Sequence, residues 1–452
     1  MIYYDNDQWL GVLFTFAGTV WPTISRPLAL WSIFALTCYA IVGQSEENTG
    51  GGHSILGATM SFLLIFRANQ SYVRYWHGRT SVSHFFGHLK AFMMFALGHA
   101  QGGKQTVAWL SGRDDELDAA VEDHNDVKAR DFRVNMVRLV VAYAVMLKVH
   151  TRIALEGYCH GKIDCDTKWL IDWDRLRLRQ LLREHEFKVV DNCLGIVTEE
   201  GEHEYTLTGL AEQFRDHCDE GPPAHWPESF DVTFVPAARM HSAIVFALHD
   251  LLLQNMNDFA NTVPWGIKER FVPYLGHFVQ SSDFALDMVN QIMSTPVPLP
   301  FAHLCKTLLS VWMCSYPFVT DFSLGFFGVF VIPFLVVLAL LGIDSISTEL
   351  ENPFGDDAND LDILEGICRL ETEAMELLEM TGDFKGRDQF VWRRMPEFVS
   401  EQSNKPIMQH LAARELATDE VAPSRSVTPA SSHRSALSVA SLVRSVSEGS
   451  FG

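Results

Sequence analysis

The sequence predicts an all-α protein that crosses a membrane several times. Hydrophobic residues make up 48% of the 452 residues, and 31 residues are Phe. The acidic residues, which bring the formal net charge to −21, avoid the most apolar stretches and gather between them. Residues 322–343 contain no charged side chain and are long enough to cross ~30 Å of hydrocarbon as a helix. A chain this acidic lacks the basic patches of nucleic-acid-binding proteins, so we expect no nucleic-acid partner.

Four segments are candidates for membrane helices: 24–42, 55–66, 304–318 and 322–343. Pro333 would kink a helix in the last of them, which membrane helices tolerate. The segment at 55–66 is too short to span alone, but a helix that continues past Arg67 could cross if its polar face met protein or water. Apolar spans beside partly polar ones indicate a channel or a transporter rather than an anchored enzyme.

The basic residues predict the orientation in the membrane. Arg67, Arg74, Arg79 and Lys90 follow the second candidate span, whereas residues 43–53 hold two Glu and no Lys or Arg. Because basic residues concentrate on the cytosolic side, the N-terminus and the Arg-rich segment should share the cytosolic or stromal side. Four spans would return the C-terminus to that side.

Composition and pattern divide the chain into five parts. Residues 1–100 hold the N-terminal segment and the first two membrane helices, and residues 101–233 form a soluble helical region with an acidic insert. Residues 234–362 begin with an amphipathic cytosolic helix and contain the last two spans and an NPFG-acidic segment. Residues 363–422 form an acidic helical extension, and the Ser- and Arg-rich tail at 423–452 has the composition of a disordered segment.

No metal site or catalytic set can be assembled from the scattered Cys and His residues. The eight cysteines have no regular spacing, and Cys159, His160 and Cys165 lack a second ligand pair at zinc spacing. His84 and His88 lack the intervening Glu of the His-Glu-x-x-His pattern, so we interpret them as packing or interface histidines. No nucleophile, base and acid stand at a spacing typical of catalysis, and we predict that the protein is not an enzyme.

Three sequence blocks carry a resemblance to a known family. They read FRANQSYVRYWHGR at 66–79, PLPF at 298–301 and GIDSISTELENPFGDDANDLDI at 342–363. In this order and at these separations they resemble the bestrophin family in its bacterial, plant and algal form. The resemblance covers about 9–100 and 234–362. It implies a homopentamer around one axial pore, with four membrane helices per subunit and a large helical cytosolic region.

The resemblance also implies a narrow hydrophobic neck lined by the second membrane helix. The neck positions correspond here to Ala58, Phe62 and Phe66, which are four residues apart and share one helix face. Five copies would turn each Phe into an aromatic ring that can gate by dewetting, and the ring edges tolerate a passing anion. Ala58 departs from the bulky residues of animal members and implies a wider or shorter constriction. The alternative is that both Phe side chains simply pack.

The family motif continues after the neck at Arg67, Asn69, Tyr72, Arg74, Trp76 and Arg79. Many family members have acids where this chain has Val73 and His77, so the segment is more positive than in its relatives. If it faces the pore, this change favours anions. Alternatively, the arginines satisfy helix carbonyls or the preference for basic residues on the inner side. Because bacterial relatives include cation-selective members, the family alone does not fix the selectivity.

The segment after the NPFG sequence at 352–355 matches the place where animal members bind calcium. The candidate ligands are Asp356, Asp357 and Asp360. Calcium prefers several carboxylates, and Ala358 and Asn359 replace acids of the animal sequence, so the charge of the site is reduced. Asp360 is alternatively the N-cap of a helix that begins at Leu361. Calcium is the one cofactor that the sequence suggests.

We therefore predict a bestrophin-like anion channel for chloride, with bicarbonate as a second candidate ion. The expected partners are the lipid bilayer, chloride and other small anions, and further copies of the chain. The expected location is the plasma membrane or the chloroplast thylakoid membrane.

Two alternatives stay open on the sequence alone. The acidic insert, at about 156–231, could concentrate cations near a vestibule and make the channel cation-conducting. The chain could also be a non-conducting scaffold or regulatory subunit, with the insert and the tail as docking surfaces. In that case Ser426, Ser435 and Ser445, which each follow an Arg, are candidate phosphorylation sites.

Overall fold

The predicted helical fold is confirmed by a computed structural model of the chain. The structure describes residues 18–42, 51–100, 124–159, 162–192, 229–231, 238–257, 266–319, 325–355 and 359–380. These residues form helices almost throughout, with two small two-stranded sheets. All of them lie in one compact unit, Met1–Asn404.

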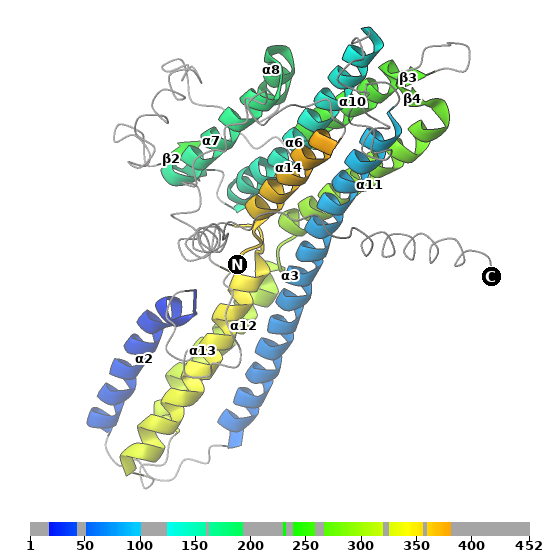
Figure 1. The fold of residues 1–452 in the computed structure, drawn as a ribbon. Helices are drawn as coiled ribbons and strands as arrows, with labels where there is room; N and C mark the ends of the chain where they lie inside the picture. Colours follow the sequence, from blue (N-terminus) through cyan, green and yellow to red (C-terminus); the bar gives the residue numbers. More distant parts are fainter. Residues whose placement is uncertain are drawn as a thin grey trace, which may run out of the picture. The chain divides into compact units, whose positions relative to one another are not determined.

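The longest element is α3 (Gly51–His99), a single helix of 49 residues. At about 1.5 Å per residue, such a helix is longer than the thickness of a bilayer. It contacts α12 and α13 along one part and α11, α6 and α14 along another (Figure 1). The predicted second span at 55–66 is therefore the first part of a much longer helix, which runs through Arg67 without a break.

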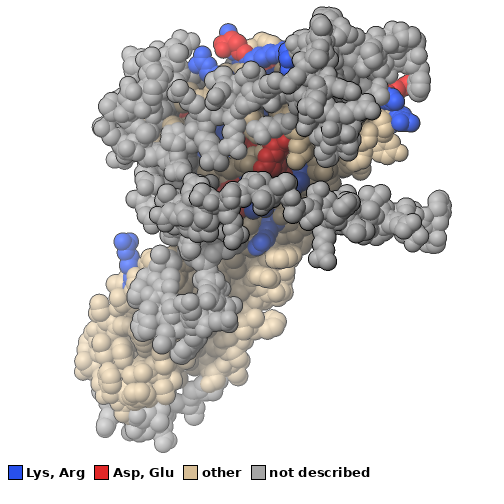
Figure 2. All heavy atoms as spheres, in the orientation of Figure 1, with Lys and Arg blue, Asp and Glu red and all other residues tan. Residues whose placement is uncertain are grey.

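The first part of α3 packs against α12 (Leu299–Ser315) and α13 (Ile332–Glu351), and α13 packs in turn against α2 (Trp21–Val42). Their shared core is built from large apolar side chains: Leu28, Trp31, Met60, Leu64, Leu309, Trp312, Val337 and Leu340. The outer face is also apolar, since Leu30 and Leu335 are 69% and 55% exposed. Figure 2 shows this part of the molecule almost free of charged side chains. A large exposed apolar surface of this kind is typical of contact with lipid.

Length and composition support two or three membrane spans among the described helices. Trp21–Ile41 and Phe327–Glu351 each suffice to cross a membrane. A third span results if the pair Glu269–Ser294 and Leu299–Phe318, bent by 45°, counts as one. The predicted number of four membrane helices stays a prediction.

The last span differs from the expected kinked α-helix. A π-helical turn, Phe327–Val331, precedes α13, and Pro333 lies in the first turn of α13. Proline has no N–H to donate, so it interrupts the hydrogen bonds of the continuing helix, and the π-helical turn directly before α13 marks this irregularity. The third predicted span begins earlier than expected, at Leu299, and Pro317 falls in the 3-10 turn Tyr316–Phe318.

A second core joins the remaining helices to the other part of α3. These helices are α6 (His124–Cys159), α7 (Cys165–Leu181), α8 (Glu184–Asn192), α10 (Ala238–Gln254), α11 (Val272–Ser294) and α14 (Ile363–Met380). Helix α6 is buried without interruption from Leu139 to Ala154. The amphipathic pattern predicted after residue 234 is confirmed as α10, which buries Ile244, Leu248 and Leu252.

The acidic insert predicted at about 156–231 is partly a folded element. Its described residues form α7 and α8, and Trp169, Ile171 and Leu178 are buried in the second core. Strand β1 (Lys162–Asp164) pairs antiparallel with β2 (Ser229–Asp231), which brings the two ends of the intervening segment together. Residues 193–228 lie outside the described residues.

Three further features complete the description. Strand β3 (Met256–Asn257) pairs parallel with β4 (Ile267–Lys268), and the 3-10 turn Glu269–Phe271 leads into α11. The extension predicted at 363–422 is described only as α14. The Ser- and Arg-rich tail lies outside the described residues, as do its three candidate phosphorylation sites.

Candidate functional site

The three predicted neck residues lie on an exposed face of α3. Phe62 is 69% exposed, Phe66 is 46% exposed, and Ala58 is also exposed. Met60 and Leu64 lie on the opposite face and are fully buried. The two Phe side chains are therefore not part of this chain's own core, which argues against simple packing within one subunit.

The neighbour of Phe66 comes from the PLPF block. The ring of Phe301, in α12, meets the Phe66 ring edge to face, with 6.0 Å between centroids and 81° between planes. This edge-to-face contact fixes one side of the Phe66 ring and leaves the rest of it accessible.

The exposed face continues along α3 beyond the neck. At about 3.6 residues per turn, five residues after the neck share the face of Phe62. They are Asn69, Val73, His77, Thr80 and His84, and each is exposed. Ala58, the two Phe and these five residues form one uncharged stripe, which we call the α3 stripe. It contains no acid, and its only titratable groups are two imidazoles.

Arg67 points away from the α3 stripe. Its side chain is buried, and its guanidinium forms ion pairs with Asp344 and, at 3.3 Å, with Glu351. It also donates a hydrogen bond to the Thr348 hydroxyl at 3.3 Å. All three partners belong to α13. Arg67 therefore joins α3 to α13, and its charge is neutralised where the helix leaves the apolar core.

Arg74 binds backbone carbonyl oxygens, whereas Arg67 binds carboxylates. Its Nε donates to the carbonyl oxygen of Glu351 at 2.6 Å, and its two Nη atoms donate to the carbonyls of Ile292 and Thr295. These carbonyls lie at the C-terminal ends of α13 and α11, where helix carbonyls lack partners and attract positive charge. Of the two roles that the sequence left open for the arginines, Arg74 has the carbonyl-binding one.

The other motif residues after the neck remain accessible. Tyr72 and Trp76 are more than half exposed, and Asn69 and Arg79 are also exposed. The guanidinium of Arg79 lies over the Trp76 ring, 5.8 Å from its centroid, in a cation–π contact.

The first and third sequence blocks meet at Gly78. The Phe354 ring of the NPFG turn is fully buried against α3. A Cβ on Gly78 would lie 3.0 Å from the Phe354 ring and 3.0 Å from Pro353. Only glycine permits this approach without a shift of the turn. The family motif thus depends on contacts between residues far apart in the sequence.

The predicted calcium residues are only partly described. Asp356 and Asp357 lie outside the described residues, and Asp360 is buried. The alternative prediction, that Asp360 is the N-cap of the following helix, is wrong. Helix α14 begins at Ile363, and the N–H of Glu365 donates to Asp362 Oδ1 at 2.8 Å. Asp362 is therefore the cap.

Asn359 is one of the two residues at which the resemblance implied the loss of an acid. Its side-chain Nδ2 donates to the carbonyl oxygen of Gly18 at 2.8 Å and to Glu349 Oε1 at 2.5 Å. The backbone carbonyl oxygen of Asn359 accepts a hydrogen bond from the Tyr75 hydroxyl at 3.2 Å. The amide thus bridges two oxygens of separate segments. Within the described part of the chain, no group of three or more His, Cys, Asp or Glu could hold a metal ion.

A buried polar cluster between α6, α10 and α11 has no signal in the sequence. The Tyr143 hydroxyl donates to Asp283 at 3.3 Å, and His241 lies 3.4 Å from the same carboxylate. The pKa of His150 is lowered to about 4, mainly by burial and to a lesser extent by the neighbouring His241. Burial, and then Asp283, raise the pKa of Tyr143. These residues come from three helices with no shared spacing, so only the fold brings them together.

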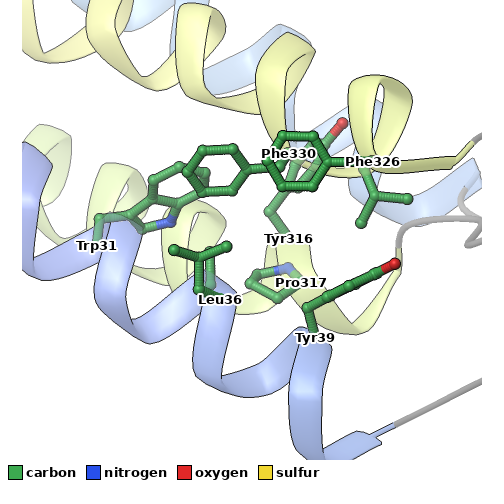
Figure 3. A pocket seen from close by; sticks show the side chains of 9 residues that line it. Trp31, Leu36, Tyr39, Tyr316, Pro317, Phe326 and Phe330 are labelled. Carbon is green, nitrogen blue, oxygen red and sulfur yellow. The ribbon is translucent and has the colours of Figure 1, made fainter.

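An apolar pocket between α2 and the π-helical turn is too small to bind a ligand. Its cavity volume is about 10 Å³, roughly the volume needed for one water molecule. Figure 3 shows that aromatic and aliphatic side chains close around it, among them Trp31, Leu36, Tyr39, Tyr316, Pro317, Phe326 and Phe330. We interpret it as a gap in the helix contacts.

The chain resembles known proteins along most of its length. It matches a family model described as Bacterial/Fungal Bestrophin protein over residues 1–194 and 268–376. This match corrects the extent of the resemblance seen in the sequence. It includes 101–194, which lie outside the predicted resemblance, and it omits 234–267, which lie within it. Helices α6, α7 and α8 therefore belong to the shared part of the chain.

Two cyanobacterial proteins are similar in sequence, and both are named voltage-dependent anion channel-forming protein. The one from Nostoc sp. is 24% identical over 371 residues, which cover 80% of this chain and 89% of that protein. The one from Synechocystis sp. is 21% identical over 366 residues, which cover 80% of this chain and 88% of that protein.

Crystal structures of a bacterial bestrophin homologue from Klebsiella pneumoniae are similar in fold. For two variants of that protein the TM-scores are 0.51 and 0.52, at 17% sequence identity. The likeness covers 79% and 81% of this chain and 99% and 100% of those chains.

Proposed function

Because the chain belongs to the family of bacterial and fungal bestrophin proteins, we propose that it is an anion channel that conducts chloride across a membrane. The three sequence blocks predicted the bestrophin family, and the family match confirms that prediction. Two relatives carry the name of anion channel-forming proteins, which supports a channel rather than an enzyme. Bicarbonate is the second ion that we propose, since a pore for one small monovalent anion can admit another.

The α3 stripe is the observation that carries the proposal. Phe62 and Phe66 are large apolar side chains that α3 presents outward, while its opposite face is buried in the chain's own core. In a closed ring of subunits, this face would surround the axis and form two aromatic constrictions. Such constrictions control passage by dewetting, and aromatic edges favour an anion over a cation.

We attribute the anion preference to the uncharged α3 stripe and not to Arg67 or Arg74. Arg67 and Arg74 are engaged by α13 and α11, so neither guanidinium is free to attract an anion in the pore. The preference follows instead from the neutrality of the α3 stripe, where Val73 and His77 stand at positions that are acidic in many relatives. A stripe without acids does not concentrate cations.

The acidic residues described in α7 and α8 give little support to a cation channel. Asp174 pairs with Arg152, Asp191 with Arg175 at 2.8 Å, and Glu186 with Arg138 at 2.5 Å. Paired carboxylates contribute little field at a distance. The cation alternative therefore depends on residues 193–228.

We propose four membrane helices per subunit in a homopentamer of the plasma or thylakoid membrane. They are α2, the first part of α3, α12, and α13 with its π-helical turn. Helix α3 is not apolar enough to span by composition alone. Its crossing is made possible by the neutralised Arg67 and by a polar face turned toward water in the pore.

The proposal is tested by the reversal potential of the purified full-length protein in planar bilayers under a potassium chloride gradient. We expect a shift toward the chloride equilibrium potential, and a smaller shift of the same sign with bicarbonate substituted for chloride. A shift toward the potassium potential would overturn the anion assignment while leaving the family unchanged.

A further inference from the structure

Three histidines surround an open groove between α3 and α11. His84 and His88 come from α3, and His277 comes from α11. The groove holds about 310 Å³. Its other lining residues are polar or apolar but uncharged: Ser81, Gln280, Ser281, Phe284, Ala285 and Met288.

The imidazoles are the only ionisable groups in the described lining of the groove, and the exposed Asp287 of α11 lies outside that lining. No Asp, Glu, Lys or Arg is among its described lining residues. On the other face of α11, Asp283 is engaged with Tyr143 and His241. The charges of α14 lie in a separate groove with Arg79 and Lys90.

The three imidazoles influence one another. The ring centroids of His84 and His88 are 6.2 Å apart. Partial burial, followed by repulsion from His84 and His277, lowers the pKa of His88. The side chains of His84 and His277 are exposed to solvent. Imidazole is the side chain that gains a proton as the pH falls through the physiological range, so acidification adds positive charge to the groove.

The groove lies in line with the proposed neck. His84 follows Phe66 by 18 residues, which is five turns at about 3.6 residues per turn, so both side chains leave the helix in the same direction. The distance along the axis is about 27 Å at about 1.5 Å per residue. His77, also exposed, lies on the same face between them. An ion path along the α3 stripe would thus pass the groove.

We propose that His84, His88 and His277 form a proton-controlled binding site for a small inorganic anion beside the ion path. The position of the site in the path rests on the proposed function, whereas the binding chemistry does not. A protonated imidazole carries positive charge and offers both ring N–H groups as donors. The hydroxyl of Ser281 and the amide of Gln280 add neutral donors to the groove, whereas the Ser81 hydroxyl donates to the His77 carbonyl at 2.9 Å. Acidification would therefore concentrate anions in the ion path that leads to the neck and raise chloride conduction.

Anion binding at the site is tested without measuring an ionic current. If protonated imidazoles bind the anion more tightly, then at equilibrium the bound anion must raise the proton affinity of the imidazoles by the same factor. The C2–H exchange of each imidazole, followed by mass spectrometry, gives its titration midpoint in the full-length protein in lipid nanodiscs. With chloride in place of gluconate at equal ionic strength, we expect the midpoints of His84 and His277 to rise by about 0.5 pH unit or more. His185, exposed on α8, is the internal control and should not move. Equal midpoints in both salts would overturn the proposal.

The role in conduction is tested separately by the pH dependence of the chloride current. We expect the wild-type current to rise several-fold between pH 8 and pH 6. His84→Gln and His277→Gln should remove most of this rise, His84→Lys should keep the current high at pH 8, and His185→Gln should behave as wild type. A wild-type current without pH dependence, or variants that keep it, would overturn the role of the groove. Absence of any chloride current would instead contradict the proposed function, and the titration would still decide the site.

Discussion

Arg67 and Glu351 form an ion pair between α3 and the end of α13, with 3.3 Å between Nη2 and Oε2. The other carboxylate oxygen of Glu351 accepts the backbone N–H of Val297 at 3.1 Å, and its carbonyl oxygen accepts Arg74 Nε at 2.6 Å. Glu351, in the third block, thus contacts the first block and the residue directly before the second, although more than two hundred residues separate the first block from the other two. Arg67 and Arg74 stabilise this junction.

Replacing Arg67 should destabilise the protein without changing its ion preference. In Arg67→Gln, Asp344 and Glu351 lose the charge that neutralises them in a largely buried position. Breaking a buried ion pair typically costs about 3–5 kcal/mol. Size-exclusion chromatography after heating should show earlier loss of the folded oligomer. Arg79→Gln, at an exposed position, is the control and should melt near wild type. A stable Arg67→Gln protein with an altered reversal potential would place Arg67 in the pore after all.

Two glycines of α3 should respond in opposite directions to the same substitution. Gly78→Ala forces a methyl group to 3.0 Å from Phe354 and Pro353, and overpacking of this kind costs about 1–3 kcal/mol. Gly87→Ala meets no atom within 4 Å and should stabilise the helix by up to about 1 kcal/mol. Thermal unfolding in detergent measures both. Equal melting temperatures would contradict the close contact between α3 and the NPFG turn.

Asn359 offers a test of the calcium prediction. Its amide donates to the Gly18 carbonyl and to the Glu349 carboxylate, so it joins two oxygens that a cation could otherwise bridge. Asn359→Asp should place two carboxylates together, lower the melting temperature in EDTA, and create a gain in stability with calcium larger than in wild type. Asn359→Ala loses the same hydrogen bonds without adding charge and should gain no such response. If calcium affects the Asp and Ala variants equally, Asn359 does not stand in a cation-binding position.

The polar cluster on α6 should make the stability depend on pH. The pKa of buried His150 is lowered to about 4, so the folded state keeps this imidazole neutral. The unfolded state binds the proton below about pH 6.5, which means that stability is present above that pH and is lost as the pH falls toward 4. The loss for this group is about 3 kcal/mol. Denaturation midpoints between pH 7 and pH 4.5 should fall less steeply in His150→Gln than in wild type. Parallel curves would show that His150 is not the titrating group.

The helices could be predicted from the sequence, but most of their partners could not. Apolar length located the last span, and periodicity located α10, because both signals are local. The partners of Arg67 lie at Asp344 and Glu351, and no local pattern reveals a contact over that separation. The role of the motif arginines was therefore left open until the fold was known.

The acidic insert shows why composition can mislead. The charges of α7 resemble a solvated surface in the sequence. In the structure, Arg152 pairs with Asp174 and Arg175 with Asp191, and these partners come from neighbouring helices. The apolar positions between them, such as Trp169, are then free to be buried. A segment rich in both signs of charge can be a folded helix pair when each charge meets its partner.

The N-cap of α14 shows a signal that the sequence contained. Asp362 and Glu365 stand three residues apart, as in a capping box, and the Glu365 N–H donates to Asp362. Spacing alone could therefore have selected Asp362 over Asp360. In contrast, the groove of three histidines required the fold, because His277 lies far from His84 and His88 in the chain.

The central claim is that the face of α3 that carries Phe62 lines the ion path. The most direct test is the accessibility of this position to a charged thiol reagent during conduction. In Phe62→Cys, an anionic methanethiosulfonate should abolish most of the chloride current within the time in which the thiol reacts. Phe327→Cys is the matched control, since Phe327 is 70% exposed and Phe62 is 69% exposed. Phe327, however, lies on the span that we propose to face lipid. The wild type with its native cysteines gives the baseline. An unchanged current in Phe62→Cys, with attachment of the reagent verified by mass, would contradict the claim.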